Sequence, residues 1–215
     1  MHVSLAGNDT IKAMLTPILI DLPEEMSTDR TVVRPYRAGD GVALFEAVDE
    51  SREHILPWMP WGPGHQSSED SEKLVRTFRA RWELREDLGV GIFEKETGRY
   101  IGGSGLHRID WNIRSFEIGY WIRKSAEGKG HVTDTVKLLT QLAFELLEAN
   151  RVFIRCAAAN ERSAAVAKRA GFYYEGRLRN GIQDAYGNLH DTLMFSMIPS
   201  EWADEIKKHP KPLRK

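Results

Sequence analysis

The sequence lacks several features that would mark particular classes of protein. Its 215 residues contain one cysteine, Cys156, so no disulfide can form within the chain, and a reducing compartment is the simplest setting. The 30 lysines and arginines nearly balance the 31 aspartates and glutamates, giving a net charge of −1. This balance argues against broad electrostatic binding to nucleic acid or to an anionic membrane. We therefore expect no nucleic-acid partner and no membrane partner.

Long apolar runs are also missing. Crossing a bilayer takes roughly 20 apolar residues, and the N-terminal run "AMLTPILIDL" is shorter and includes Asp21. It has neither the basic leader nor the small-residue cleavage site of a signal peptide, so we expect a cytoplasmic protein. No group of histidine, cysteine and aspartate has metal-ligand spacing, and we expect no metal. Cys156 lies in an apolar strand and is expected to be a core residue rather than a nucleophile.

What the sequence does contain is an alternation of strand and helix patterns. "TVVRPYRAGD" predicts a strand over 31–34 and a helix capped by Asp40. "GVGIFEKETGRYIGGSGLHRI" predicts two strands around a turn, and "RSFEIGYWI" alternates as a strand with two different faces does. Helical patterns follow, so we expect an α/β (α+β) domain with a mixed, mostly antiparallel, twisted central sheet flanked by helices.

The stretch "YWIRKSAEGKGHVTDTVKLL" combines a strand, a glycine loop and an amphipathic helix. A helix N-terminus has unpaired N–H groups and a partial positive charge. A loop with small residues lets these groups converge on a phosphate, and Lys129 adds a cation. The loop alone also fits ordinary turn chemistry. Its spacing matches neither G-x-G-x-x-G nor G-K-[ST], which argues against a nucleotide-binding enzyme.

Six motifs then occur in one order along residues 30–198: "VRPYRAGD", "LPWMPW", "IGGSGLHRIDW", "FEIGYWI", "EGKGHVTDTV" and "NERSAAVAKRAGF". Together they resemble the GNAT acetyltransferases, and more narrowly the RimJ/RimL branch, which acetylates the N-termini of ribosomal proteins. The resemblance implies a single GNAT domain over 29–200, with an N-terminal extension over 1–28 and a C-terminal tail over 201–215. It also implies acetyl-CoA as co-substrate.

The resemblance further implies which residues contact the cofactor. Two of them depart from the family pattern, since Glu127 stands where the family has Gln or Arg and Val132 where many members have Gly or Ala. A carboxylate near a pyrophosphate would lower the affinity. The family's asparagine contacts the pantetheine arm, and its serine lies near the thioester sulfur. The implied cofactor contacts are Ile122, Glu127, Gly128, Lys129, Gly130, His131, Val132, Thr133, Asn160 and Ser163.

Acetyl transfer to an amine needs a neutral amine, an adjacent thioester and a donor for the leaving thiolate. Glu117 is our candidate base, because strands disfavour glutamate unless it has a role or an exposed face; a solvent-facing residue is the alternative. Many GNAT enzymes carry an acid tyrosine four residues beyond the motif serine, and that position is Ala167 here. We therefore expect Ser163 to stabilise the thiolate, with Tyr173 and Tyr174 as alternatives.

The remaining candidates are given simpler roles. His107 and His131 are assigned no acid–base chemistry, and Asn160 also suits a helix cap. Trp58, Met59 and Trp61, on a proline-punctuated loop, predict either an acceptor groove or a small hydrophobic cap.

Taken together, the residues predict an acetyl-CoA-dependent N-acetyltransferase in which the amine attacks the bound thioester directly. The acceptor stays open between a protein N-terminus, such as that of a ribosomal protein, a lysine and a small amine. The alternative is a non-catalytic module that binds or senses acyl-CoA. The apolar segment around 18–22 leaves a homodimer open.

Overall fold

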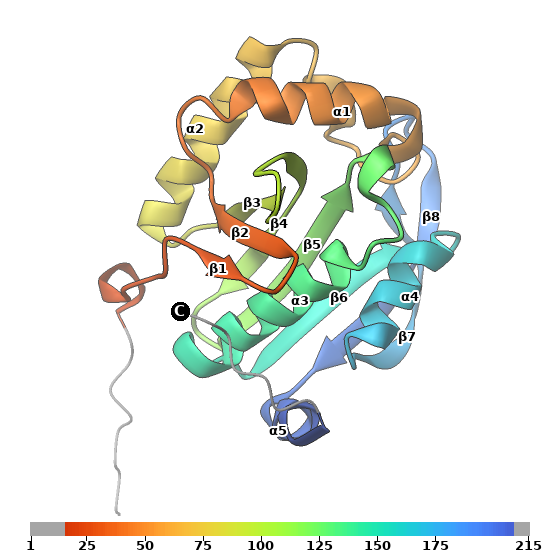
Figure 1. Cartoon of the computed structure of the whole chain (residues 1–215). Coiled ribbons are helices and arrows are strands. Elements are labelled where there is room, and N and C mark those ends of the chain that lie inside the picture. The colour runs from red at the N-terminus through yellow and green to blue at the C-terminus, as the bar shows by residue number, and fades with distance from the viewer. Residues whose placement is uncertain (1–15, 209–215) are drawn as a thin grey trace, which may run out of the picture.

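The computed structural model describes residues 16–208. Within them, eight strands form one sheet in the order β1-β2-β3-β4-β5-β6-β8-β7, with helices on both of its faces (Figure 1). All neighbouring strands run antiparallel except β5 and β6. The predicted mixed, mostly antiparallel sheet is therefore confirmed. The outer parts of the predicted extension and tail, 1–15 and 209–215, lie outside the described residues.

The strands are β1 (Met26–Ser27), β2 (Thr31–Pro35), β3 (Leu88–Glu94), β4 (Tyr100–Asp110), β5 (Ser115–Ile122), β6 (Arg151–Ala157), β7 (Tyr173–Gln183) and β8 (Leu189–Met197). The α-helices are α1 (Gly41–Ile55), α2 (Ser68–Leu84), α3 (His131–Gln141), α4 (Glu161–Arg169) and α5 (Pro199–Lys208). Short 3-10 turns form η1 (Pro17–Leu19), η2 (Gly62–Gly64) and η3 (Lys124–Ala126), and a π-turn, η4 (Leu142–Leu146), extends α3. No helix within 16–208 is long and apolar enough to cross a membrane.

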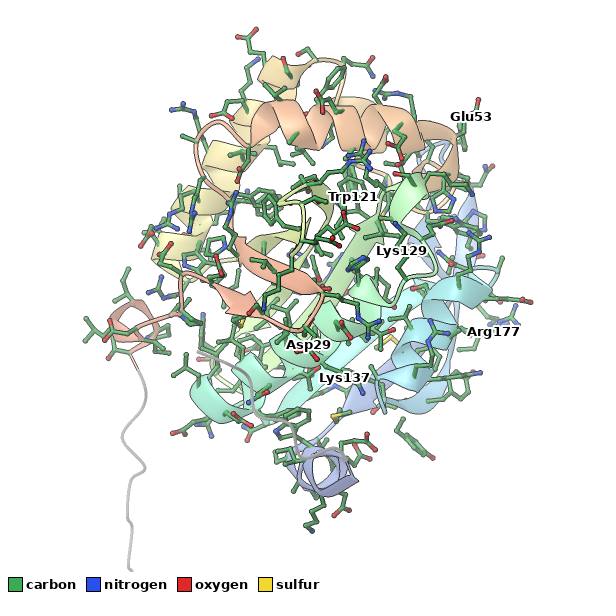
Figure 2. The ribbon with its side chains drawn as sticks, viewed as in Figure 1. Asp29, Glu53, Trp121, Lys129, Lys137 and Arg177 are labelled. Carbon is green, nitrogen blue, oxygen red and sulfur yellow. The ribbon has the colours of Figure 1, made fainter. Side chains whose placement is uncertain are left out.

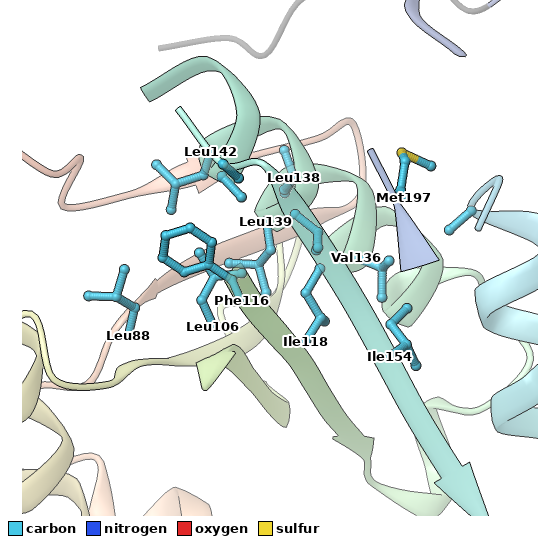
Figure 3. Close-up of a cluster of buried hydrophobic side chains, with 14 of the residues drawn as sticks. Leu88, Leu106, Phe116, Ile118, Val136, Leu138, Leu139, Leu142, Ile154 and Met197 are labelled. Atoms are coloured by element: carbon cyan, nitrogen blue, oxygen red, sulfur yellow. The ribbon is translucent and has the colours of Figure 1, made fainter. Parts of the chain in front are cut away.

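Two hydrophobic clusters hold the helices on the sheet. On one face, Phe116 and Ile118 of β5 pack with Val136 and Leu139 of α3 (Figure 3). On the opposite face, Tyr100 belongs to a second cluster that includes apolar residues of α1 and α2. Burying a large apolar side chain contributes about 1.5–3 kcal/mol, so the period-two pattern of β5 fixes which face receives α3.

The parallel pair β5–β6 is short and then opens. The two strands pair only through Ser115 with Arg151, Phe116 with Val152 and Glu117 with Phe153. Beyond that point β5 continues to Ile122 beside β4 alone, while β6 continues to Ala157 beside β8 alone. The facing edges of the two strands therefore separate, and their backbone groups are available to a ligand.

Asp40 occupies the predicted N-cap position of α1, but its side chain makes no capping hydrogen bond. Its carboxylate accepts instead from Nη1 and Nη2 of Arg34, at 2.7 and 2.8 Å, and from the N–H of Arg37. The start of α1 is capped from α2, because Glu72 accepts from the N–H groups of Gly39 and Gly41. A two-pronged arginine contact is the stronger partner for a carboxylate, so it prevails over the local cap.

An ion pair ties α1 to the end of β5. Glu50 accepts from Nε of Arg123 at 2.9 Å and from the N–H of Ser125 at 2.9 Å. Burial raises the pKa of Glu50, but the hydrogen bonds from Ser125 and Arg123 outweigh it and lower that pKa to about 2. The contact anchors the chain just before the glycine loop.

Glu50→Gln is expected to destabilise the fold by about 1 kcal/mol at neutral pH, allowing for solvent screening, or about 2–4 °C in Tm. The carboxylate stabilises the fold above its ordinary pKa of 4.5 and loses that effect as the pH falls through 2. The Tm values of variant and parent should therefore converge as the pH falls from 4.5 to about 2. Glu53→Gln, on the exposed side of the same helix, should match the parent throughout. A Tm difference between Glu50→Gln and the parent that stays constant with pH would contradict the lowered pKa of Glu50.

Candidate active site

A cleft of about 490 Å³ lies where β5 leaves β6. Its walls include Tyr120 and Trp121, whose side chains point to opposite faces of β5 and pack with different hydrophobic clusters. The cleft therefore reaches both faces of the sheet. It is lined by His54, Ile55, Trp58, Met59, Tyr120, Trp121, Ile122, Lys124, Glu127, Val132, Ala159, Asn160, Glu161, Arg162, Ser163 and Val166.

The glycine loop turns tightly into α3 beside this cleft. Gly128 and Gly130 have φ values of +74° and +86°, a conformation that costs other residues roughly 1–2 kcal/mol. Gly130 caps α3, and within 16–208 no acceptor reaches the N–H groups of residues 131–133. These groups sit at the positive end of the helix. Figure 2 shows Lys129 in this region and Trp121 nearer α1. The arrangement suits an anion.

Glu127 joins three elements at the mouth of the cleft. Its two oxygens lie 3.0 and 2.9 Å from Nη1 of Arg162 on α4. One oxygen lies 2.5 Å from Nε2 of His54 on α1, and the other lies 3.4 Å from Nζ of Lys124. Burial lowers the pKa of His54, while Glu127 opposes that shift. The carboxylate thus neutralises cations that line the same cleft.

Two hydroxyl groups meet deeper in the cleft. Ser163 donates from Oγ to Oη of Tyr120 at 3.0 Å, and that hydroxyl donates to the Ser163 carbonyl at 3.0 Å. Burial raises the pKa of Tyr120 well above its ordinary value. Asn160 accepts from the N–H of Ser163, so the predicted helix cap is confirmed. The pair is a ready source of a hydrogen bond to a leaving sulfur.

Tyr120 is a site residue that sequence reasoning missed. The family pattern directs attention to α4, where Ala167 stands, and to Tyr173 and Tyr174, which are exposed on β7 and do not line the cleft. The hydroxyl comes instead from β5. The strand alternation that separates Tyr120 from Trp121 was the available signal. Cys156 is buried in the core as predicted, and burial raises the pKa of its thiol.

Glu117 lies at the last paired position before the strands separate and is 9% exposed. Arg155 of β6 donates to it from Nε and Nη2, both at 3.1 Å. Nε of Arg108 lies 2.7 Å from the same carboxylate. Both oxygens are therefore occupied by guanidinium groups, and the role of Glu117 as a base stays a prediction.

The other predicted contacts fall into two groups. Ile122, Glu127, Val132, Asn160 and Ser163 line the cleft. Gly128, Lys129, Gly130, His131 and Thr133 belong to the adjoining loop and the first turn of α3 without lining it.

The side chain of His131 is turned away from solvent. It is buried with Nδ1 2.9 Å from Oγ1 of Thr31, and burial lowers its pKa. Any contact between His131 and a ligand would thus use its backbone. Among residues 16–208, no cluster of three or more histidine, cysteine or acidic side chains could hold a metal ion.

Comparison with known proteins shows which family this chain resembles. Residues 30–173 match the model of the acetyltransferase (GNAT) domain. YdaF of Bacillus subtilis (strain 168), provisionally named a ribosomal N-acetyltransferase, is 32% identical over 178 residues, 82% of this chain and 96% of that protein.

Solved structures share the fold. RimL, the ribosomal L7/L12 α-N-protein acetyltransferase, in complex with coenzyme A, has a TM-score of 0.76 at 22% identity, covering 81% of this chain and 98% of its own. The microcin C7 self-immunity acetyltransferase MccE, with acetyl-CoA and AMP, has a TM-score of 0.75 at 23% identity, covering 80% and 93%. The family model and the similarity to YdaF show that the chain belongs to the GNAT family of N-acetyltransferases.

Proposed function

We propose that the cleft holds acetyl-CoA with its pyrophosphate on the loop and first turn of α3, residues 128–133. The pantetheine arm would lie between the separating edges of β5 and β6. The observation that carries this proposal is the opening of β5 from β6 directly beside the unpaired N–H groups of α3. The coenzyme A and acetyl-CoA complexes of RimL and MccE support it.

In this arrangement the thioester lies near Tyr120 and Ser163. The acceptor nitrogen attacks the carbonyl carbon, an N–C bond forms, and the C–S bond breaks to release the thiolate. The amine nitrogen, positively charged after attack, loses one proton to water. The thiolate takes up a proton from the hydroxyl pair, and that pair is reprotonated from water. The raised pKa of Tyr120 keeps its hydroxyl protonated, as a donor requires.

We propose a protein N-terminus, of the ribosomal-protein type, as the acceptor. At pH 7 roughly a tenth of α-amines are neutral, against a few parts in ten thousand for lysine, so an N-terminus makes a smaller demand on the site. The names of RimL and YdaF support this substrate class. Trp58, Met59 and Trp121 line the side of the cleft that the acceptor would enter. A small molecule with an amine is the rival acceptor, because the structure of MccE, a microcin C7 self-immunity acetyltransferase, holds AMP as well as acetyl-CoA.

The direct test incubates the protein and acetyl-CoA with three acceptors: a ribosomal-protein N-terminal peptide, the same peptide with a blocked N-terminus and one internal lysine, and a polyamine. Mass spectrometry should find acetyl groups on the free N-terminus and none on the blocked peptide. Preferential transfer to the polyamine would overturn the acceptor proposal. Binding of acetyl-CoA with no transfer to any amine would favour the non-catalytic sensing module.

A matched pair of glycines tests the phosphate loop. Gly128 and Gly98 have similar φ values, +74° and +68°, and an added Cβ meets nothing within 4 Å at either. Alanine at either position should cost about 1 kcal/mol of stability. Gly128→Ala alone should weaken acetyl-CoA binding, about tenfold by calorimetry, because a shifted loop misdirects its N–H groups. Equal affinities for the two variants would rule out the loop as the phosphate site.

A second pair tests the carboxylate at the cleft mouth. Glu127→Gln should tighten acetyl-CoA binding about five- to tenfold, roughly 1–1.4 kcal/mol, because Arg162 and Lys124 are released to meet phosphate. The gain should shrink at high salt. Glu53→Gln, on the exposed side of α1 (Figure 2), is the control and should leave the affinity unchanged. Weaker binding by Glu127→Gln would mean that Glu127 positions these cations instead of competing for them.

A further inference from the structure

A histidine–aspartate pair lies on the face of the sheet that the acceptor would approach. Nδ1 of His107, on β4, is 2.9 Å from both carboxylate oxygens of Asp87, the residue before β3. An ionised carboxylate only accepts hydrogen bonds, so Nδ1 carries the hydrogen and the neutral ring has its lone pair on Nε2. Within residues 16–208 no hydrogen-bond partner reaches that Nε2.

The ring of His107 lies across two glycines. A Cβ at Gly105 would come 2.7 Å from Cε1, and a Cβ at Gly119 would come 3.1 Å from Cδ2 and 3.5 Å from Nε2. A side chain at Gly105 would displace the ring or the adjacent backbone of β3, and one at Gly119 would press against the ring. The two glycines therefore bring Nε2 over β5 at Gly119, two residues beyond the last pair that β5 makes with β6.

This position is on the opposite face of β5 from the hydroxyl pair. Gly119 precedes Tyr120, whose hydroxyl lines the cleft with Ser163 on the α3 side of the sheet. His107 is outside the cleft lining, on the same face of β5 as Trp121, which does line the cleft. A thioester held between the separating strands would therefore have the hydroxyl pair on one side and, on the other, the face on which His107 lies. Acetyl transfer needs a base beside the attacking amine and a hydrogen-bond donor beside the leaving sulfur, and these two groups would lie on opposite sides of the thioester.

We propose that His107 is the catalytic base and that Asp87 is a positioning residue for it; this inference rests on the proposed function. Attack on the thioester gives the acceptor nitrogen a positive charge, and one of its protons passes to Nε2. The C–S bond then breaks, and the thiolate takes its proton from the hydroxyl pair. The imidazolium, stabilised by Asp87, returns its proton to water.

The neighbouring Glu117 fits a different role. It is the cross-strand partner of His107, on the same face, but its oxygens are already taken by Arg155 and Arg108. Arg108 has a φ of +45° at a bulge of β4, a conformation that a functional contact often imposes. We assign Glu117 a structural role: its contact with Arg155 holds β5 to β6 at the position where the two strands separate.

Charged and aromatic groups surround His107. On the sheet it is faced by Asp87 and by Glu117 with Arg108 and Arg155. The hydroxyl of Tyr36 lies over Gly103, further along β4. From α2, the ring of Phe78 packs at 6.3 Å between centroids.

His107→Asn in the full chain is the sharpest test. The asparagine amide replaces Nδ1 as the donor to Asp87 and removes Nε2. Calorimetry should show unchanged acetyl-CoA affinity, which also establishes that the variant folds. With saturating substrates, kcat should fall about 10²- to 10⁴-fold, and the rise of kcat from acid pH should disappear. His107→Ala should regain part of its activity with added imidazole, and Asp87→Asn should lose less than His107→Asn.

Two results would overturn the proposal. One is a kcat for His107→Asn within threefold of the parent; the other is Glu117→Gln losing a hundredfold while His107→Ala shows no rescue by imidazole. Failure of the proposed function is separately visible, because the parent protein would then acetylate no amine. An active parent with an unaffected His107→Asn removes only the role of His107.

Discussion

The separation of β5 from β6 after three paired positions is the constraint on which the site depends. A sheet that stayed closed would satisfy its own backbone groups and leave no room for an extended ligand. Because the strands part, the edge of β5 becomes available, and the cleft can reach both faces of the sheet. In the proposed function, cofactor and acceptor would approach one carbonyl from opposite sides, and positioning would supply much of the catalysis.

Two carboxylates, at the two ends of this opening, are each held by several cations. Glu127 lies at the phosphate end among Arg162, His54 and Lys124. Glu117 lies where the strands part, between Arg155 and Arg108. Removing one partner of such a pair leaves the other charge uncompensated. The two networks therefore organise the cleft before any ligand enters, and in the proposed complex Glu127 would compete with the phosphate for the same cations.

The sequence was sufficient for features that depend on local pattern. The alternation of β5, the helix cap by Asn160 and the glycine loop before α3 follow from neighbouring residues, and the family motifs implied a mixed, mostly antiparallel sheet. Contacts between distant residues could not be read in this way. The side chain of Asp40 is bound by Arg34 and does not cap α1. The partner of His107 is Asp87, which lies in the connection between α2 and β3. Strand alternation shows which face a residue occupies, not what it meets there.

The most direct test of the account is amide hydrogen exchange of the parent protein with and without coenzyme A. The account predicts slower exchange in two separate segments, the loop and first turn of α3 at 128–133 and the open edge of β5 at 118–122. Protection should be absent from the β7–β8 hairpin, which the ligand does not reach. Protection confined to one segment, or spread evenly over the sheet, would contradict a cofactor that spans the helix N-terminus and the opening between the strands.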